Sequence, residues 1–162
     1  MPKRLSADAR KLVLTSAIEE ARRRGDSRLG TDHLLLGILH DEDSPEAQAL
    51  GVSLADARAA SQALDVAALA AVGIRVRALD EGLPASFGRR LPPLSSGARA
   101  VFKHAIDEAR PVKSGRINTT HFLLALLSLQ RPDPAAELLD ALGVDRAAVR
   151  KHLGGPAEGD AR

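Results

Sequence analysis

Two histidines, His33 and His121, are the first residues whose type and spacing invite a chemical interpretation. Each closely follows a threonine and opens a nearly all-apolar run, "GTDHLLLGIL" (30–39) and "NTTHFLLALL" (118–127). A histidine beside a hydroxyl can act as the base that activates a nucleophile. However, no third orienting residue shares the pattern, and the start of a helix disfavours a charged imidazole. We therefore interpret both histidines as structural, assign each threonine as the N-cap of its helix, and predict a non-enzymatic protein.

The remaining histidines do not form a metal-ligand pattern. His33 and His40 are seven positions apart, which is about 10.5 Å along a helix axis and too far for two ligands of one zinc ion. His104 and His152 have no second histidine three or four positions away, and the chain contains no cysteine. The sequence therefore predicts no metal site and no cofactor, and the lack of cysteine is typical of a reducing compartment.

An internal repeat explains why the histidine motif occurs twice. "AIEEAR" (17–22) returns as "AIDEAR" (105–110), displaced by the same 88 positions as the two histidines. Both copies predict an amphipathic helix, the first capped by Ser6 and stopped by Gly25, the second capped by Ser95 or Ser96. The predicted apolar stripes are Leu14, Ala17, Ile18 and Ala21 in the first copy and Phe102, Ala105, Ile106 and Ala109 in the second. One structural unit is therefore used twice.

Helical hairpins with a central glycine follow each apolar helix. They cover residues 45–64, 65–83 and 134–153, with Gly51, Gly73 and Gly143 as the respective stops. The first half thus has one hairpin more than the second, and about ten short helices are expected. No strand-like alternation is evident. The predicted fold class is all-α, a pseudo-twofold tandem repeat of a four-helix motif with an extra helical hairpin after the first repeat.

The domain boundaries follow from this plan. We assign residues 1–83 to the first repeat plus the extra hairpin, 84–93 to a linker, 94–153 to the second repeat and 154–162 to a disordered tail. The start of the chain lacks the apolar core of a signal peptide, and no run has the length of a membrane span. Together with a formal charge of +2, this favours a cytoplasmic protein that binds neither nucleic acid nor membrane. The arginine clusters 22–24 and 89–90 are interpreted as solvated faces, with Glu19 and Glu20 offsetting the first, because the chain has no Trp or Tyr to stack on bases.

The two apolar motifs and the ending "ALGVDRAAVRKHL" resemble the Clp amino-terminal domain, a double four-helix repeat at the front of Clp-family AAA+ unfoldases. The likeness covers about residues 5–64 and 92–153, and the hairpin at 65–83 is similar to an elaboration in free-standing actinobacterial relatives. No G-x-x-x-x-G-K-[ST] motif is present to hold ATP phosphates. The resemblance therefore implies an amino-terminal domain without its motor.

The resemblance also implies a function and candidate ligand-binding residues. The family's domain docks adaptors and substrates, so we expect partners among Clp unfoldases, their adaptors and their substrates. ClpC-type members also recognise phosphoarginine through a glutamate whose place is taken here by Asp32 and, in the second repeat, by the uncharged Thr120. Ser6 and Ser95, at helix N-termini, are candidates for holding the phosphate, with plain capping as the competing interpretation.

An alternative role is that of a small-ligand sensor or sequestering protein, because the family's repeat interface also accepts cyclic peptide antibiotics. The low aromatic content of this chain weighs against tight binding of that kind.

Overall fold

The structure, a computed structural model, describes residues 4–75, 92–113 and 115–154. Apart from two short strands, β1 (Arg4–Leu5) and β2 (Arg116–Ile117), the elements found in these residues are helices, and the predicted all-α class is confirmed. The first helix is continuous but contains a π-helical turn, so that α1 (Ala7–Lys11), η1 (Leu12–Ser16) and α2 (Ala17–Arg24) follow one another without a break. The other helices are α3 (Thr31–Ile38), α4 (Pro45–Leu50), α5 (Leu54–Ala71), α6 (Ser96–Glu108), α7 (Thr119–Leu127), α8 (Pro134–Ala141) and α9 (Arg146–Gly154).

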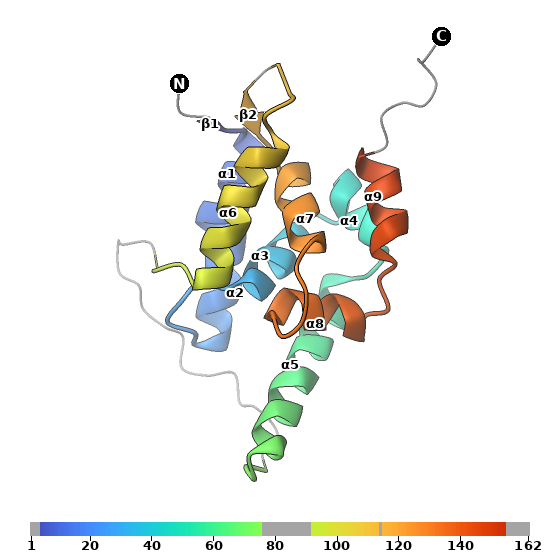
Figure 1. Cartoon of the computed structure of the whole chain (residues 1–162). Helices are drawn as coiled ribbons and strands as arrows, with labels where there is room; N and C mark the ends of the chain where they lie inside the picture. Colours follow the sequence, from blue (N-terminus) through green and yellow to red (C-terminus); the bar gives the residue numbers. More distant parts are fainter. Residues whose placement is uncertain (1–3, 76–91, 114, 155–162) are drawn as a thin grey trace.

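The two apolar helices, α3 and α7, lie at the centre of the molecule (Figure 1). α3 packs on α2 and α8, and α7 packs on α6 and α9, so that each central helix is covered from several sides. Their leucines, except the partly buried Leu124, belong together with Phe122 to one cluster of buried residues drawn from both halves of the chain. The all-round apolar character of these helices therefore has its expected cause, which is burial.

The segment that precedes the first helix of each half pairs with a segment of the other half. Leu5 pairs with Ile117 in the parallel β1–β2 ladder, and Leu94 forms a matching parallel bridge with Leu29. In both cases the residues just before the first helix of one half lie beside the residues just before the second helix of the other half. This reciprocity is the pseudo-twofold relation that the repeat predicted.

Between its N-cap and the buried alanine, the first helix of the first half has one residue more than its counterpart. Ser6 and Ser95, the two N-caps, are 89 positions apart, whereas the buried Ala17 and Ala105 are 88 positions apart. The difference arises within η1, because a π-helical turn accommodates one inserted residue while leaving the helix on either side in register.

The buried faces of the two first helices differ from the predicted apolar stripes. Leu14 is 43% exposed, while Val13 beside it is buried. In the second copy Ile106 is 41% exposed, although Ala105 next to it is fully buried. The stripe prediction was therefore wrong at Leu14 and Ile106. At Leu14 the physical reason is that η1 displaces the residue from the buried face.

Gly37 in α3 allows the close approach of α3 to η1. A methyl group at this position would lie 2.9 Å from Cδ1 of Leu12 and 3.0 Å from the backbone nitrogen of Ala17. The residue 88 positions later in α7 is Ala125, which is fully buried. The half that contains the π-turn therefore has glycine where the other half has room for a methyl group.

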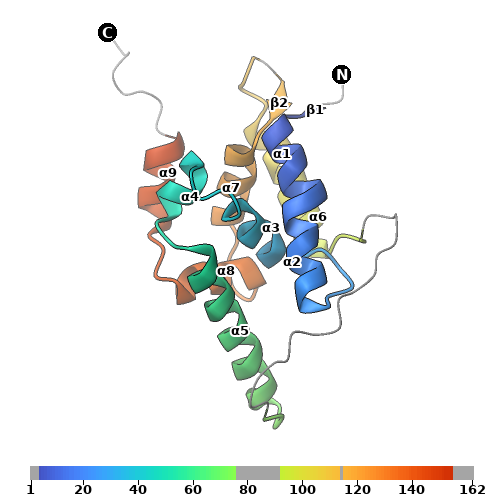
Figure 2. The same cartoon turned by 180° about the vertical axis from the view of Figure 1, so that it is seen from behind.

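The predicted hairpin at 65–83 is wrong in its first part. α5 is a single helix of 18 residues from Leu54 to Ala71, capped by Ser53, and Asp65 lies inside it. No glycine or proline interrupts the segment before Gly73, which has a φ of 86°. The end of α5 projects from the rest of the molecule (Figures 1 and 2). Residues 76–83 of the hairpin, 84–91 of the linker and 155–162 of the tail lie outside the described residues.

The N-cap assignment of the threonines is also wrong. Thr31 is the first residue inside α3 and follows the cap residue Gly30, while the cap of α7 is Asn118. The hydroxyl of Thr31 instead donates a hydrogen bond of 2.7 Å to Oδ1 of Asp133, at the start of α8. A bond to the other half of the molecule therefore replaces the local cap.

Candidate functional site

Ser6 and Thr120 lie together where α1 and α7 begin, which we call the α1–α7 junction. The backbone N–H of Ser6 donates to the carbonyl of Ile117 at 2.8 Å, and its hydroxyl oxygen accepts the N–H of Ala9 at 3.2 Å. The hydroxyl of Thr120 donates to Oε1 of Glu46 at 2.5 Å. Glu46 belongs to α4, so a carboxylate from the first half lies where Thr120 itself provides no charge.

Ser95 and Asp32 lie together where α6 and α3 begin, the α3–α6 junction. The backbone N–H of Ser95 donates to the carbonyl of Leu29 at 2.9 Å, and its hydroxyl oxygen accepts the N–H of Ala98 at 3.1 Å. The structure therefore brings the four candidate residues into two pairs at equivalent places, not into one site.

Asp32 is already engaged by a guanidinium group of the same chain. Oδ2 of Asp32 accepts a hydrogen bond of 2.5 Å from Nη1 of Arg24. The same guanidinium contacts Asp65 through Nη2 at 2.7 Å and Asp26 through Nε at 3.3 Å. These contacts join the end of α2 to α3 and α5. The interpretation of residues 22–24 as a solvated face is therefore wrong for Arg24.

The electrostatics of this cluster follow from three carboxylates sharing one guanidinium. Burial alone would lower the pKa of Arg24, but the charges of Asp32, Asp26 and Asp65 outweigh it and raise the pKa above its usual value. Burial raises the pKa of Asp65; Arg24 opposes this rise, and the nearby Asp32 and Asp26 reinforce it. The cluster therefore favours a cation, which the chain supplies with its own Arg24.

The two histidines have structural contacts. Nδ1 of His33 accepts the backbone N–H of Gly30 at 2.8 Å, so the neutral ring carries its proton on Nε2 and donates it to Asp26 at 2.7 Å. Burial would raise the pKa of Asp26, but this hydrogen bond and the charge of Arg24 hold it below its usual value. In the second half, Nδ1 of His121 accepts the backbone N–H of Asn118 at 3.0 Å. These contacts agree with the structural interpretation.

Glu20 belongs to a second cluster that the sequence did not reveal. Its side chain is 1% exposed and accepts a hydrogen bond of 2.7 Å from Nε2 of His40 and one of 2.5 Å from Nη2 of Arg58. We had placed Glu20 beside the arginines of α2 as a surface charge, which is wrong. No local signal marks the pairing, because Arg58 lies 38 positions away.

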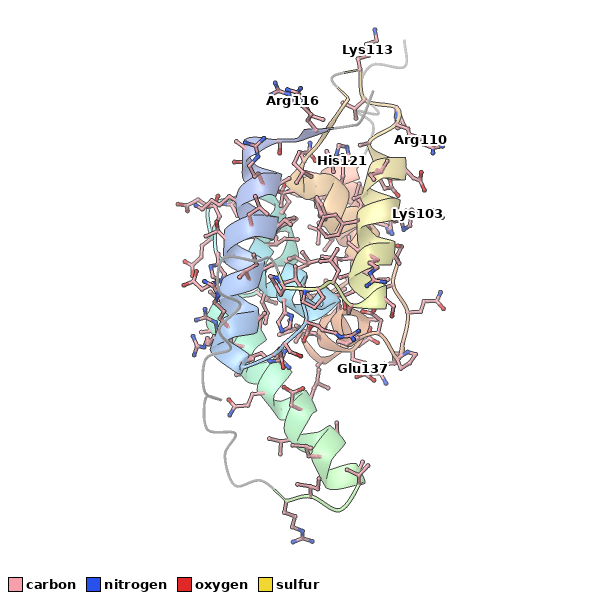
Figure 3. The ribbon with its side chains drawn as sticks, turned by 90° about the vertical axis from the view of Figure 1, so that its left-hand side faces the viewer. Lys103, Arg110, Lys113, Arg116, His121 and Glu137 are labelled. Carbon is pink, nitrogen blue, oxygen red and sulfur yellow. The ribbon has the colours of Figure 1, made fainter. Side chains whose placement is uncertain are left out.

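Basic side chains gather at the end of the molecule that contains the β1–β2 ladder. Figure 3 shows Arg110, Lys113 and Arg116 pointing outward at this end, with Lys103 farther along α6. Arg116 is the register partner of Arg4 in the ladder. These residues are scattered along the chain, so no run of basic residues predicted this end.

Neither a cluster of metal-binding side chains nor a helix able to span a membrane is found in the part of the chain that the structure describes. No group of three or more histidine, cysteine, aspartate or glutamate side chains there is arranged to hold a metal ion. None of the helices in these residues is both long and apolar enough to cross a membrane.

The fold and its paired junctions define a class of protein, namely a helical tandem-repeat domain whose two halves are interlocked at the helix N-termini. Comparison with protein families then gives its membership. The family described as the Clp repeat (R) N-terminal domain matches residues 4–132, and the chain belongs to this family.

Relatives with known names support this assignment. The chain is 31% identical over 144 residues to a ClpA homolog, an ATP-binding subunit of the ATP-dependent Clp protease, from Cyanidium caldarium. It is 28% identical over 144 residues to the chloroplastic chaperone protein ClpC2 of Oryza sativa subsp. japonica. These matches cover 87% of this chain but only 15% and 14% of the respective relatives. The free-standing actinobacterial type remains a prediction.

A solved structure supports the fold. The N-terminal domain of the chaperone ClpD from Arabidopsis thaliana superimposes with a TM-score of 0.70, covering 93% of this chain and 94% of that domain at 19% identity. The predicted Clp amino-terminal fold is thereby confirmed.

Proposed function

We propose that this protein is a non-enzymatic protein-binding module that engages substrates or adaptors of Clp-dependent proteolysis. The observation that carries the proposal is the family match over residues 4–132. The matched relatives are named as Clp ATP-binding subunits and Clp chaperones, and the matched segment is a small part of each. The module either delivers clients to an unfoldase or competes with it for them.

A degradation assay tests this proposal and separates the two modes of action. The purified protein is titrated into a reaction that contains a Clp unfoldase, its peptidase, an adaptor and a fluorescent substrate, all from the same organism. A faster reaction indicates delivery, and a slower one indicates competition. Binding to the unfoldase, adaptor and substrate is measured separately by biolayer interferometry. If no component binds and the rate is unchanged, the proposal is wrong.

The finer proposal is that the marker recognised on clients is phosphoarginine, bound at the α3–α6 junction. Two features support it. Asp32 already binds a guanidinium, and the N-termini of α3 and α6 lie side by side there, where backbone N–H groups favour a phosphate. The guanidinium of Arg24, however, occupies Asp32, so the ligand must displace an intramolecular partner.

Replacement of Arg24 tests this competition. We expect Arg24→Gln to bind free phosphoarginine about tenfold more tightly than the wild type, because Asp32 is released, and Asp32→Ala to lose binding. Isothermal titration calorimetry measures the affinities, with arginine and inorganic phosphate as control ligands. Arg23→Gln, at the exposed neighbour of Arg24, is the matched control and should bind as the wild type does. Absence of binding to both the wild type and Arg24→Gln would exclude this ligand and leave the protein-binding proposal intact.

We do not extend the proposal to antibiotic sequestration. The two phenylalanines in the described residues, Phe102 and Phe122, pack edge to face with ring centroids 5.0 Å apart, and Phe122 is fully buried. The ring of Phe122 is therefore not accessible to a ligand. The cytoplasmic location and the absence of nucleic-acid partners remain predictions.

A further inference from the structure

A pocket of about 350 Å³ lies beside the π-helical turn. Its wall is formed by α1 and η1, the C-terminal end of α3, the turn that leads into α4, and the start of α7. The volume lies in the range of small-ligand sites. The residues that line it are Asp8, Lys11, Leu12, Ser16, Gly37, Ile38, His40, Asp41, Asp43, Ser44, Pro45, Glu46 and Thr119.

The charges around this pocket are unbalanced. Three exposed carboxylates, Asp8, Asp41 and Asp43, form its rim, and the buried carboxylate of Glu46 forms part of its floor. Against these four carboxylates the lining contains one ammonium group, that of the exposed Lys11. His40 also lines the pocket, but its imidazole is hydrogen-bonded to Glu20, which is not a lining residue. α3 also ends at this wall, and the C-terminal end of a helix favours a positive charge.

Glu46 provides an observation that is independent of the acidic rim. Its side chain belongs to a residue that is only 7% exposed, and Oε1 accepts the hydroxyl proton of Thr120. No cation of the described residues pairs with Glu46, and its Oε2 accepts no hydrogen bond from them. A buried carboxylate normally has a cationic partner, because removing its charge from water is costly. α4 offers only partial compensation, since it has six residues.

We propose that this pocket binds a lysine side chain of a partner protein, with the ammonium group at Oε2 of Glu46 and the rim carboxylates around its stem. Three features carry the inference: a cavity of suitable size, an excess of negative charge, and a largely buried glutamate in the pocket lining whose Oε2 accepts no hydrogen bond from the described residues. The inference rests on the proposed function, since it names the chemistry by which a partner is recognised. A compact ammonium suits a floor formed by a single carboxylate, whereas a guanidinium favours paired acceptors.

Titration with a minimal probe tests the proposal on the full chain. N-acetyl-lysine N-methylamide is added to ¹⁵N-labelled protein, and amide chemical shifts are followed by two-dimensional NMR. N-acetyl-norleucine N-methylamide, which lacks the ammonium group, is the control ligand. We expect saturable shifts at residues 41–46 and Thr119 with the lysine probe alone, weakening as salt is raised.

Substitutions locate the binding group. Glu46→Gln preserves the acceptor for Thr120 but removes the charge, and we expect it to weaken the lysine probe about threefold to tenfold. The matched control is Glu137→Gln, a first-turn acid of α8 that lies far from His121 in Figure 3 and should leave the affinity unchanged. Asp43→Asn, at the exposed rim, provides a second test if Glu46→Gln fails to fold, and we expect it to weaken the probe by about twofold.

Three results would overturn the proposal. They are equal binding of the lysine and norleucine probes, shifts that do not involve the pocket, and unchanged affinity in the folded pocket variants. None of these bears on the degradation assay, so failure of this inference is distinguishable from failure of the proposed function.

Discussion

At the scale of single residues, Glu20 shows how a buried charge is retained by partners that are distant in sequence. Burial alone would raise its pKa, but hydrogen bonds and charge from Arg58 and His40 outweigh that effect and hold the pKa below the ordinary value of 4.5. The carboxylate is therefore ionised inside the folded protein, and its partners fix α2 against α5 and the end of α3.

We expect Glu20→Gln to lower the free energy of unfolding at pH 7 by about 3 kcal/mol, because it removes the negative charge that pairs with Arg58 and places an amide NH2 group against hydrogen-bond donors. Since the folded-state pKa lies below the unfolded one, the contribution of Glu20 is complete above pH 4.5 and is lost as the pH falls through the folded-state pKa. The difference from the wild type should therefore shrink in acid. Urea denaturation from pH 3 to pH 7 measures it. Glu19→Gln, at a side chain that is 67% exposed, is the control, and an effect of equal size there would refute the assignment.

Local roles were predictable from the sequence, whereas long-range partners were not. Ser6 and Ser95 were assigned as caps because an N-cap bonds to an N–H three positions on, and both do so. Asp32 was assigned to a ligand site, but its partner Arg24 depends on how α2 meets α3. Glu46 was not singled out at all, because its significance comes from Thr120 and from a pocket assembled by both halves.

At the scale of elements, the π-helical turn η1 is an insertion with a definite position. Deletion of Leu14 should convert the turn to a regular α-helix, because one residue is all that separates the two copies in register. We expect this variant to remain cooperatively folded with its helical content unchanged, as measured by circular dichroism during thermal unfolding.

Deletion of Ile106 is the matched control, since that residue is similarly exposed but lies in a helix without a π-turn. It would rotate the preceding part of α6 by about 100° and remove Ala98 and Val101 from the core. We expect this deletion to cost about 3 kcal/mol. Equal damage from the two deletions would contradict the account of η1.

Helix starts and stops were largely predictable, and the exceptions have local causes. Gly25, Gly51 and Gly143 all have positive φ and end their segments as expected. The helix break expected at residue 65 is absent, because no glycine or proline lies in this part of α5. The prediction had relied only on the likeness of residues 65–83 to the other hairpins. The π-turn could not be predicted, since an insertion into a helix leaves no composition signal and shifts the repeat by a single position.

At the scale of the whole molecule, hydrogen bonds between the halves contribute to one cooperative unit. The hydroxyl of Thr31 donates to Asp133 and accepts the backbone N–H of Ala135, which is buried. Thr119 is the equivalent residue of the second half, but in the described residues its hydroxyl has no such bond. The two threonines therefore share a motif but differ in their contribution to stability.

We expect Thr31→Val to lower the free energy of unfolding by about 1 to 2 kcal/mol, because two hydrogen bonds between the halves are lost. Thr119→Val should change it by less than about 0.5 kcal/mol. Differential scanning calorimetry checks both values and the shape of the transition. A single transition in both variants is expected, since the halves share one core. Separate transitions for the two halves would contradict that view.

The overall architecture was predictable because the sequence repeat indicated that one helical unit occurs twice in the chain. The resemblance then supplied the arrangement, which the ClpD domain confirms at the level of the fold. The domain boundaries remain a prediction, since most of the linker lies outside the described residues. The side-chain hydrogen bonds of Thr31 and Thr120 across the halves could not be predicted, because they join residues 74 to 104 positions apart.

The pairing of each half's first segment with the other half shows what a single repeat would lack. Leu5 pairs with Ile117 of the second half, and Leu29 pairs with Leu94 at the start of that half. A single repeat would thus leave both segments unpaired, and a second copy of the same unit supplies the partner for each. The architecture of a symmetric homodimer is therefore contained within one polypeptide, in which the two copies need not be identical, and here the π-helical turn occurs in the first helix of one copy and not in α6 of the other.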